Sequence, residues 1–174
     1  MIRYGRNQDI KEDTCYFTGD IEHIIEEVES CRDLGVTMEN SAKFELHIEN
    51  VCKKVRQKCG WVLRIFYCRD QHFLRHMFNT LIQPHIDYCS QLWTPQEGPQ
   101  LDKVEKLLKN FTAKIRSVKH LPYWERLISL RMISEQRRLE RYKIIYVWKI
   151  LHKLVANCGI EVNDSTTSER LGRK

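Results

Sequence analysis

The stretch from Phe44 to Phe66, FELHIENVCKKVRQKCGWVLRIF, has the clearest helical pattern in this 174-residue chain. Its apolar residues recur at steps of three and four, which gathers them on one face of a helix. These residues are Phe44, Ile48, Val51, Cys52, Val55, Cys59, Val62, Leu63 and Phe66. Lys53, Gln57 and Arg64 fall on the opposite side, and Lys54 lies on a flank. The pattern therefore predicts one buried face and one basic face.

Charge is distributed unevenly along the chain. Residues 1–42 carry 4 Lys and Arg against 10 Asp and Glu, whereas residues 43–153 carry 22 against 10. The formal net charge of +6 therefore conceals an acidic start and a strongly basic body. A basic body is typical of a protein that binds a polyanion, most often nucleic acid. A solvated basic surface without a ligand has the same composition, so both interpretations stay open.

Cysteine usage and hydropathy indicate the compartment. The seven cysteines are odd in number, lie within helical periodicity and follow no signal peptide, which favours reduced thiols over a disulfide framework. No apolar run reaches the length of a membrane span. We expect a soluble intracellular protein, in either the cytoplasm or the nucleus, with no membrane partner.

The acidic first part has the signals of short strands. Gly19-Asp20 is a turn signal between two apolar segments, and Arg32 to Val36 is typical of a strand that bends at Gly35. Asn40-Ser41 is the expected cap of the long helix. Residues 1–42 are therefore predicted to contain a short β-hairpin.

The basic part has the signals of about five helices. The second is expected to begin at Asp70 and to kink or stop at Pro84, and the third to have Pro99 in its first turn. A short fourth helix follows Pro122, and Ser134 is expected to cap the fifth.

The end of the fifth helix is apolar on all sides. From residue 144 to residue 155 the apolar residues, Trp148 among them, point all round the helix axis. This pattern predicts the centre of the bundle. The expected fold is mainly α, of the α+β class: residues 1–42 with the hairpin, residues 43–156 as a basic helical bundle, and residues 157–174 as a polar tail.

Two sets of polar residues are candidates for sites. Cys68, His72 and His76 are four residues apart, as in some zinc sites, but arginines surround them and no fourth ligand follows, so we expect no metal. Lys53, Lys54, Lys58 and Arg64, with Trp61 among them, are spaced to follow a phosphate backbone and to stack on a sugar or base. The alternative is an ordinary solvated helix face.

The order of these segments resembles the C-terminal end of the reverse transcriptase of non-LTR retrotransposons, particularly the jockey-like elements of animals. Arg32 to Val36 looks like the family's Lys-x-Leu-Gly-Val segment near the primer grip, with Arg32 in place of the Lys. The start of the long helix, from His47 to Lys54, looks like the first helix of the thumb. Pro84 to Tyr88, followed by Trp93, is similar to the family's Pro-x-Leu/Ile-x-Tyr helix.

The resemblance implies a palm edge and a helical thumb that hold a template–primer duplex without reading its sequence. It implies Arg32 and Gly35 at the grip, with Lys53, Lys54, Lys58, Trp61 and Arg64 on the thumb. The family's Tyr/Phe-Ala-Asp-Asp motif, which holds Mg²⁺ in the intact enzyme, has no counterpart in this chain.

We therefore expect a fragment without catalytic residues or a cofactor of its own, inactive alone, whose further partner is the remainder of the polymerase. The alternative is a non-enzymatic helical interaction module, or an inactive remnant of a mobile element.

Overall fold

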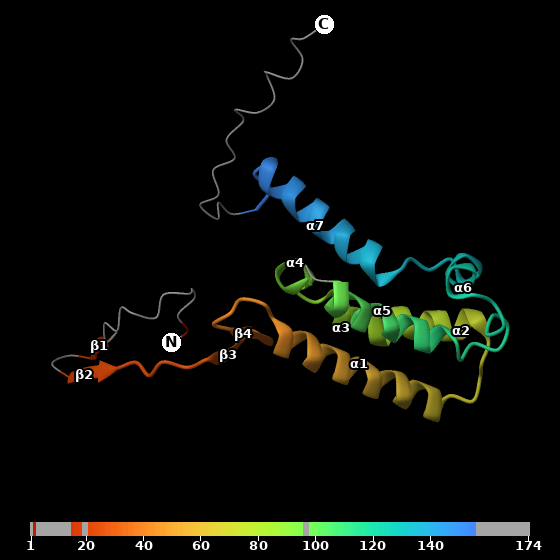
Figure 1. Cartoon of the computed structure of the whole chain (residues 1–174), viewed down its shortest axis with the longest axis horizontal. Helices are drawn as coiled ribbons and strands as arrows, with labels where there is room; N and C mark the ends of the chain where they lie inside the picture. The colour runs from red at the N-terminus through yellow and green to blue at the C-terminus, as the bar shows by residue number, and fades with distance from the viewer. Residues whose placement is uncertain (1, 3–14, 19–20, 96–97, 156–174) are drawn as a thin grey trace, which may run out of the picture.

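The computed structural model describes residue 2 and residues 15–18, 21–95 and 98–155. Residues 1 and 3–14, the polar tail expected at residues 157–174 and the turn at Gly19-Asp20 lie outside the described residues. In the part that is described, two β-hairpins precede seven α-helices and one π-helical segment (Figure 1). The prediction of a mainly α protein with an N-terminal hairpin is confirmed.

The strands form two separate hairpins where one was expected. β1 (Cys15–Thr18) pairs antiparallel with β2 (Ile21–Ile24), and β3 (Ser30–Asp33) pairs with β4 (Val36–Glu39). The segment from Arg32 to Val36 is therefore the tip of the second hairpin, because Asp33 pairs with Val36 across a two-residue turn. β4 contacts the first long helix, so this hairpin lies against the bundle.

The long helix, α1 (Glu45–Ile65), buries the predicted stripe. Ile48, Val55 and Val62 are fully buried, and Val51 and Cys52 nearly so. The predicted cap at Asn40-Ser41 is wrong, because Ala42 and Phe44 adopt left-handed backbone conformations that turn the chain before the helix begins. The carboxylate of Glu39 instead accepts a hydrogen bond from the backbone N–H of Leu46, at 3.0 Å.

The second predicted helix kinks and continues. Asp70 caps α2 (Gln71–Met77) by accepting hydrogen bonds from the backbone N–H groups of residues 72 and 73, as expected. These bonds lower the pKa of Asp70. The π-helical segment η1 (Phe78–Ile82) then leads into α3 (Gln83–Asp87), and Pro84 lies in the first turn of α3, where its missing N–H is tolerated. A one-turn helix, α4 (Ser90–Trp93), follows.

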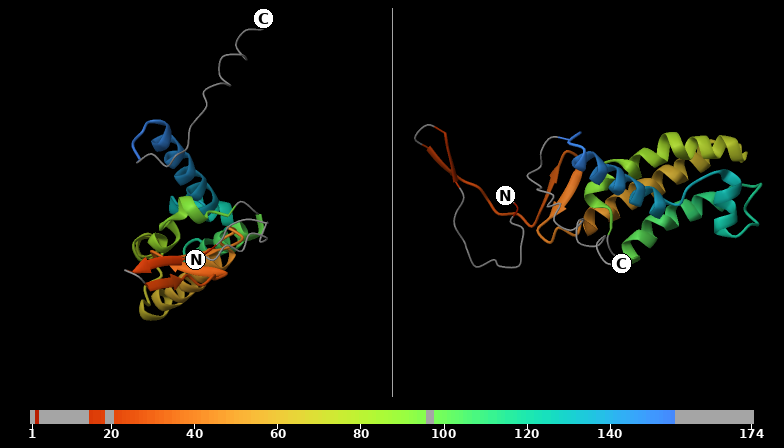
Figure 2. Two further views of the ribbon diagram at one scale, coloured as in Figure 1. Left: turned by 90° about the vertical axis from the view of Figure 1, so that its left-hand side faces the viewer. Right: turned by 90° about the horizontal axis from the view of Figure 1, so that it is seen from above.

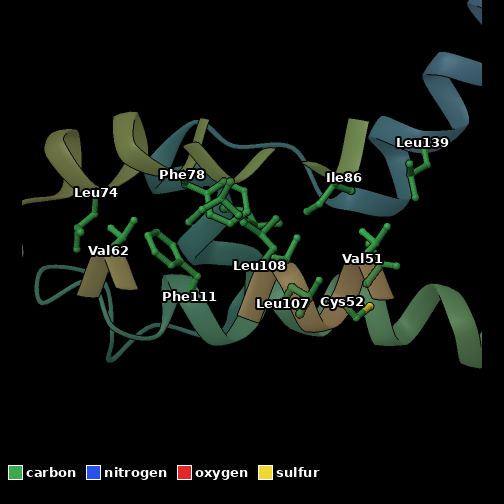
Figure 3. Packing of buried hydrophobic residues seen from close by; sticks show 14 of the residues in the cluster. Val51, Cys52, Val62, Leu74, Phe78, Ile86, Leu107, Leu108, Phe111 and Leu139 are labelled. Atoms are coloured by element: carbon green, nitrogen blue, oxygen red, sulfur yellow. The ribbon is translucent and has the colours of Figure 1, made fainter. Parts of the chain in front are cut away.

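Three helical segments enclose the core. α5 (Gly98–Thr112) packs on α1, and the α2–η1–α3 rod lies against α1 as well. Figure 3 shows side chains of these helices meeting, among them Val51 and Cys52 of α1, Leu108 and Phe111 of α5, and Phe78 of η1. The rings of Phe78 and Phe111 lie 5.0 Å apart. α6 (Tyr123–Leu130) contacts α2 and α5.

The first half of α7 (Glu135–Leu151) is held by a buried polar cluster. The side-chain amide of Gln83 donates to Glu135 Oε2 at 3.0 Å and to Asp87 Oδ1 at 2.9 Å. The hydroxyl of Tyr142 donates to Asp87 Oδ2 at 3.2 Å, and Arg138 Nη1 lies 3.9 Å from the same oxygen. Burial raises the pKa of the fully buried Glu135 to about 7.

The second half of α7 contradicts the prediction made for it. Trp148 is 51% exposed, and Ile144 and Leu151 are exposed as well, so this segment is not the centre of the bundle. α7 contacts α4 and α5, its fully buried residues Glu135 and Leu139 lie in its first half, and its later turns extend away from the bundle (Figure 2). The apolar pattern correctly indicated a helix, but the neighbours that it required are not in the described part of this chain. None of the described helices combines the length and the apolar character needed to cross a membrane.

Candidate nucleic-acid interface

The tip of the second hairpin is fixed against α3. Leu34 and Gly35 have φ angles of 44° and 87°, as a two-residue hairpin turn with positive φ at both positions requires. A Cβ atom at Gly35 would lie 3.7 Å from Cε1 of Tyr88, an ordinary contact, so the backbone conformation and not the space favours glycine here. The hydroxyl of Tyr88 donates to the carbonyl oxygen of Leu34 at 2.7 Å. The turn is thereby held beside the start of the bundle.

A groove of about 610 Å³ runs between this turn, α1 and the region of α3. The hairpin contributes Arg32, Leu34, Gly35 and Thr37, α1 contributes His47, Asn50, Val51 and Lys54, and the α3 region contributes Pro84, His85 and Tyr88. No Asp or Glu is among these described lining residues. The groove thus brings cations from the hairpin and from α1 to one place, although 21 residues separate Arg32 from Lys54 in the sequence.

The electrostatics of the groove are those of a cationic site. The pKa of His85 is lowered, first by partial burial and then by the positive charges of Lys54 and Lys58. Lys58 is therefore close enough to act on this ring, although it does not line the groove. A neutral His85 keeps a hydrogen-bonding ring beside two lysines, a combination suited to phosphate oxygens and sugar hydroxyls.

His47 connects the groove to the core. The backbone N–H of Thr37 donates to His47 Nδ1 at 3.2 Å, so the proton of the neutral ring lies on Nε2. Burial and the charge of Arg32 lower the pKa of His47, which agrees with the neutral form. Nε2 is buried and has no hydrogen-bond partner among the described residues, and the ring packs against Trp93 at 5.5 Å between centroids. His47 thus ties β4 to α1 and fixes one wall of the groove.

The seven predicted binding residues do not form a single cluster. Arg32, Gly35 and Lys54 line the groove together, and Lys58 follows Lys54 by one helical turn. Trp61, which is 50% exposed, continues this row and packs edge-on against Phe66. The helical spacing of Lys53 and Arg64 places both on the exposed side of α1 that faces away from the core. The row of Lys54, Lys58 and Trp61 leads from the groove along the helix.

Sequence patterns did not indicate His47 and His85 as groove residues. The signal for His47 was its spacing of seven residues from Lys54, which places both on one helix face. His85 lies next to Pro84 in a segment chosen only for its resemblance to a family helix, and sequence did not show that the hairpin would face it. Contacts between hairpin and helix are long-range, so local periodicity carries no information about them.

The other candidate set, Cys68, His72 and His76, is exposed. Cys68 lies in the connection between α1 and α2, while the two histidines lie on α2. Across residues 21–95 and 98–155, and the short strand before them, no group of three or more His, Cys, Asp or Glu side chains is placed to hold a metal ion. Cys31, Cys52, Cys59, Cys68 and Cys89 are free thiols.

The chain has a distant relative among known proteins. The chain is similar to an uncharacterized protein of Caenorhabditis elegans, with 22% identity over 127 residues. The match covers 71% of this chain and 62% of the worm protein, so this chain spans less than two thirds of that relative's length. The sequence matches no family profile, and no solved structure matches it.

Proposed function

We propose that this chain is the palm-edge and thumb part of an RNA-directed DNA polymerase of a non-LTR retrotransposon, and that it holds a template–primer duplex by its phosphates. One observation carries the proposal. Arg32 and Gly35, which the family resemblance assigns to the grip, line the same groove as Lys54 of the helix assigned to the thumb. Two segments that are distant in the sequence thus meet at one cationic surface.

The proposed chemistry is positioning and not catalysis. Arg32, Lys54 and Lys58 contact phosphate oxygens, His85 and Asn50 offer neutral hydrogen-bonding groups, and Trp61 offers a ring for stacking farther along the helix. Such contacts fix the register of a duplex and carry no sequence information. The proposed place of action is inside the cell, where the free thiols stay reduced.

Binding of a labelled RNA–DNA hybrid tests this proposal. The triple variant Arg32→Ala, Lys54→Ala, Lys58→Ala should bind the hybrid about tenfold or more weakly, because three phosphate contacts are removed. The matched control replaces three exposed lysines elsewhere, Lys106, Lys114 and Lys119, with alanine. The control should bind within about threefold of the parent, because screened charges at a distance contribute little. Equal losses of affinity in both triple variants would contradict the proposal, because binding would then respond to net charge in general and not to the groove.

The chain alone should not extend a primer. Phosphoryl transfer by two metal ions needs converging carboxylates, and none of the eight aspartates in the sequence is adjacent to another. An extension assay on a nuclease-free preparation, with the Asp33→Asn variant as control, measures this directly. Template-dependent synthesis that disappears in the variant would place an active site within this chain and would contradict the fragment interpretation.

A second candidate function, a helical interaction module, is favoured by the exposed apolar residues in the second half of α7. These residues lie apart from the lining of the groove, so the two functions are separable by mutation.

A further inference from the structure

Unlike an ordinary surface helix, α7 has an exposed side that is apolar. One side is turned toward the protein: Glu135 and Leu139 are fully buried, and Tyr142, Tyr146 and Ile150 are partly buried at the same helical phase. The opposite side carries Ile144, Val147, Trp148 and Leu151, which are between 51% and 68% exposed. Because this side faces away from α4 and α5, no rearrangement of side chains would bury it against them.

The apolar side is confined to the second half of the helix. One and two turns earlier, the same side of α7 carries Arg137, Glu140 and Arg141, which are exposed and polar as expected for a solvated face. The change occurs where the helix extends beyond the bundle, as Figure 1 shows. Spacings of three and four residues from 144 to 151 are those of a helix that packs against another helix. An exposed apolar patch with this periodicity marks an interaction site.

The positive charges beside the exposed apolar residues indicate the charge that a partner should carry. Arg141 and Lys143 lie on the two flanks of the apolar side, and from residue 141 to residue 155 the sequence contains no Asp or Glu. A second copy of this chain would bring cations against cations along the contact, which disfavours self-association through this face. A partner with acidic flanks would instead be attracted and oriented.

We propose that the projecting half of α7 docks an amphipathic helix of a partner protein, one that carries an apolar stripe flanked by Asp and Glu. Trp148 lies in the middle of the stripe and is the expected anchor, since tryptophan is among the residues that most often dominate such interfaces. Ile144, Val147 and Leu151 supply the surrounding apolar contact, and Arg141 and Lys143 the pairing charges. Docking on this half of α7 does not require the groove to bind nucleic acid.

A synthetic acidic helix tests the inference. The probe is a fluorescent peptide of about 18 residues with leucines at spacings of three and four and glutamates on both flanks, titrated with the full chain. We expect saturable binding, and binding at least about tenfold weaker for the same peptide with lysine flanks. Trp148→Glu should weaken binding of the acidic peptide about tenfold or more. The groove triple Arg32→Ala, Lys54→Ala, Lys58→Ala should bind it as the parent does.

Ile128→Glu on α6 is the matched control, because Ile128 is an apolar helix residue that is 77% exposed. It should leave peptide binding unchanged, and thermal melts should show that both glutamate variants fold as the parent does. Absence of binding, equal binding of the lysine-flanked peptide, or equal losses in the two glutamate variants would each overturn the inference. So would a dimer in sedimentation velocity that Trp148→Glu dissolves, or binding to phosphatidylserine vesicles that the acidic peptide does not displace.

Discussion

Helices α1 and α7 are both rich in apolar residues, yet the chain provides neighbours for only one of them. α1 has an amphipathic pattern, and its apolar stripe is buried against α5 and the α2–η1–α3 rod. α7 has apolar residues all round its axis in its second half, yet its fully buried residues, Glu135 and Leu139, lie in its first half. An apolar pattern therefore indicates how much contact a helix needs, but it does not indicate whether the same chain supplies that contact.

The largest expected effect is on the buried face of α1. Val51→Asp should destabilise the fold by about 3 kcal/mol or more, because Val51 is only 8% exposed and an unpaired charge there loses its hydration. Chemical denaturation with circular dichroism detection measures the free energy of unfolding. A variant as stable as the parent would mean that the packing of α1 differs from the one described.

Replacing Glu135 tests how the start of α7 is attached to the bundle. The expected change in the free energy of unfolding depends on pH. The folded protein raises the pKa of Glu135 from 4.5 to about 7, mainly through burial and partly through Asp87 and Glu105, while Gln83 and Arg138 oppose the shift. The folded state therefore binds the proton more tightly than the unfolded state. The wild type should lose stability as pH rises from about 4.5 to about 7, by about 3 kcal/mol in total.

Glu135→Gln removes this titration and retains an oxygen that accepts the hydrogen bond from Gln83. The variant should be about 3 kcal/mol more stable than the parent at pH 8 and near the parent at pH 4.5. Unfolding curves at both pH values give the difference. A constant difference across pH would show that Glu135 does not titrate in this range, and that the polar cluster holds α7 in another way.

Two alanine substitutions in α7 compare its halves. Leu139→Ala should cost about 2 kcal/mol or more, because Leu139 is fully buried and a cavity remains. Trp148→Ala should change the free energy of unfolding by less than about 0.5 kcal/mol, because the indole is 51% exposed and its ring packs on His152 of the same helix end and not on the core. A large loss at Trp148 would restore the original prediction that this half is buried within the chain.

Local patterns predicted the parts of the fold that depend on neighbours in sequence. The stripe of α1, the cap at Asp70, the kink near Pro84 and the cap at Ser134 all follow from spacing or from the chemistry of one residue. The cap at Asn40-Ser41 failed because a carboxylate from β4 and two left-handed residues fixed the helix start. The prediction that Trp148 is buried was wrong, because the burial of a side chain depends on segments that are distant in the sequence.

For the candidate interface, too, the sequence indicated single residues but not how they come together. Sequence identified Arg32, Gly35 and Lys54 separately, and the folded chain places them around one groove. It did not identify His47 and His85, whose roles depend on the hydrogen bond from Thr37 and on the approach of the hairpin to α3. Lys53 and Arg64, chosen because they lie on the basic face, are on the side of α1 away from the core and outside the groove lining.

The most direct test of the groove as a phosphate-binding surface is the salt dependence of hybrid binding, measured for the parent and the two triple-alanine variants. The logarithm of the association constant should fall linearly with the logarithm of salt concentration, with a slope of about −0.9 for each phosphate contact. We expect the slope of the Arg32, Lys54 and Lys58 variant to be shallower by about two to three, and that of the Lys106, Lys114 and Lys119 variant to equal the parent's. Identical slopes for the two variants, or binding that does not respond to salt, would contradict the account.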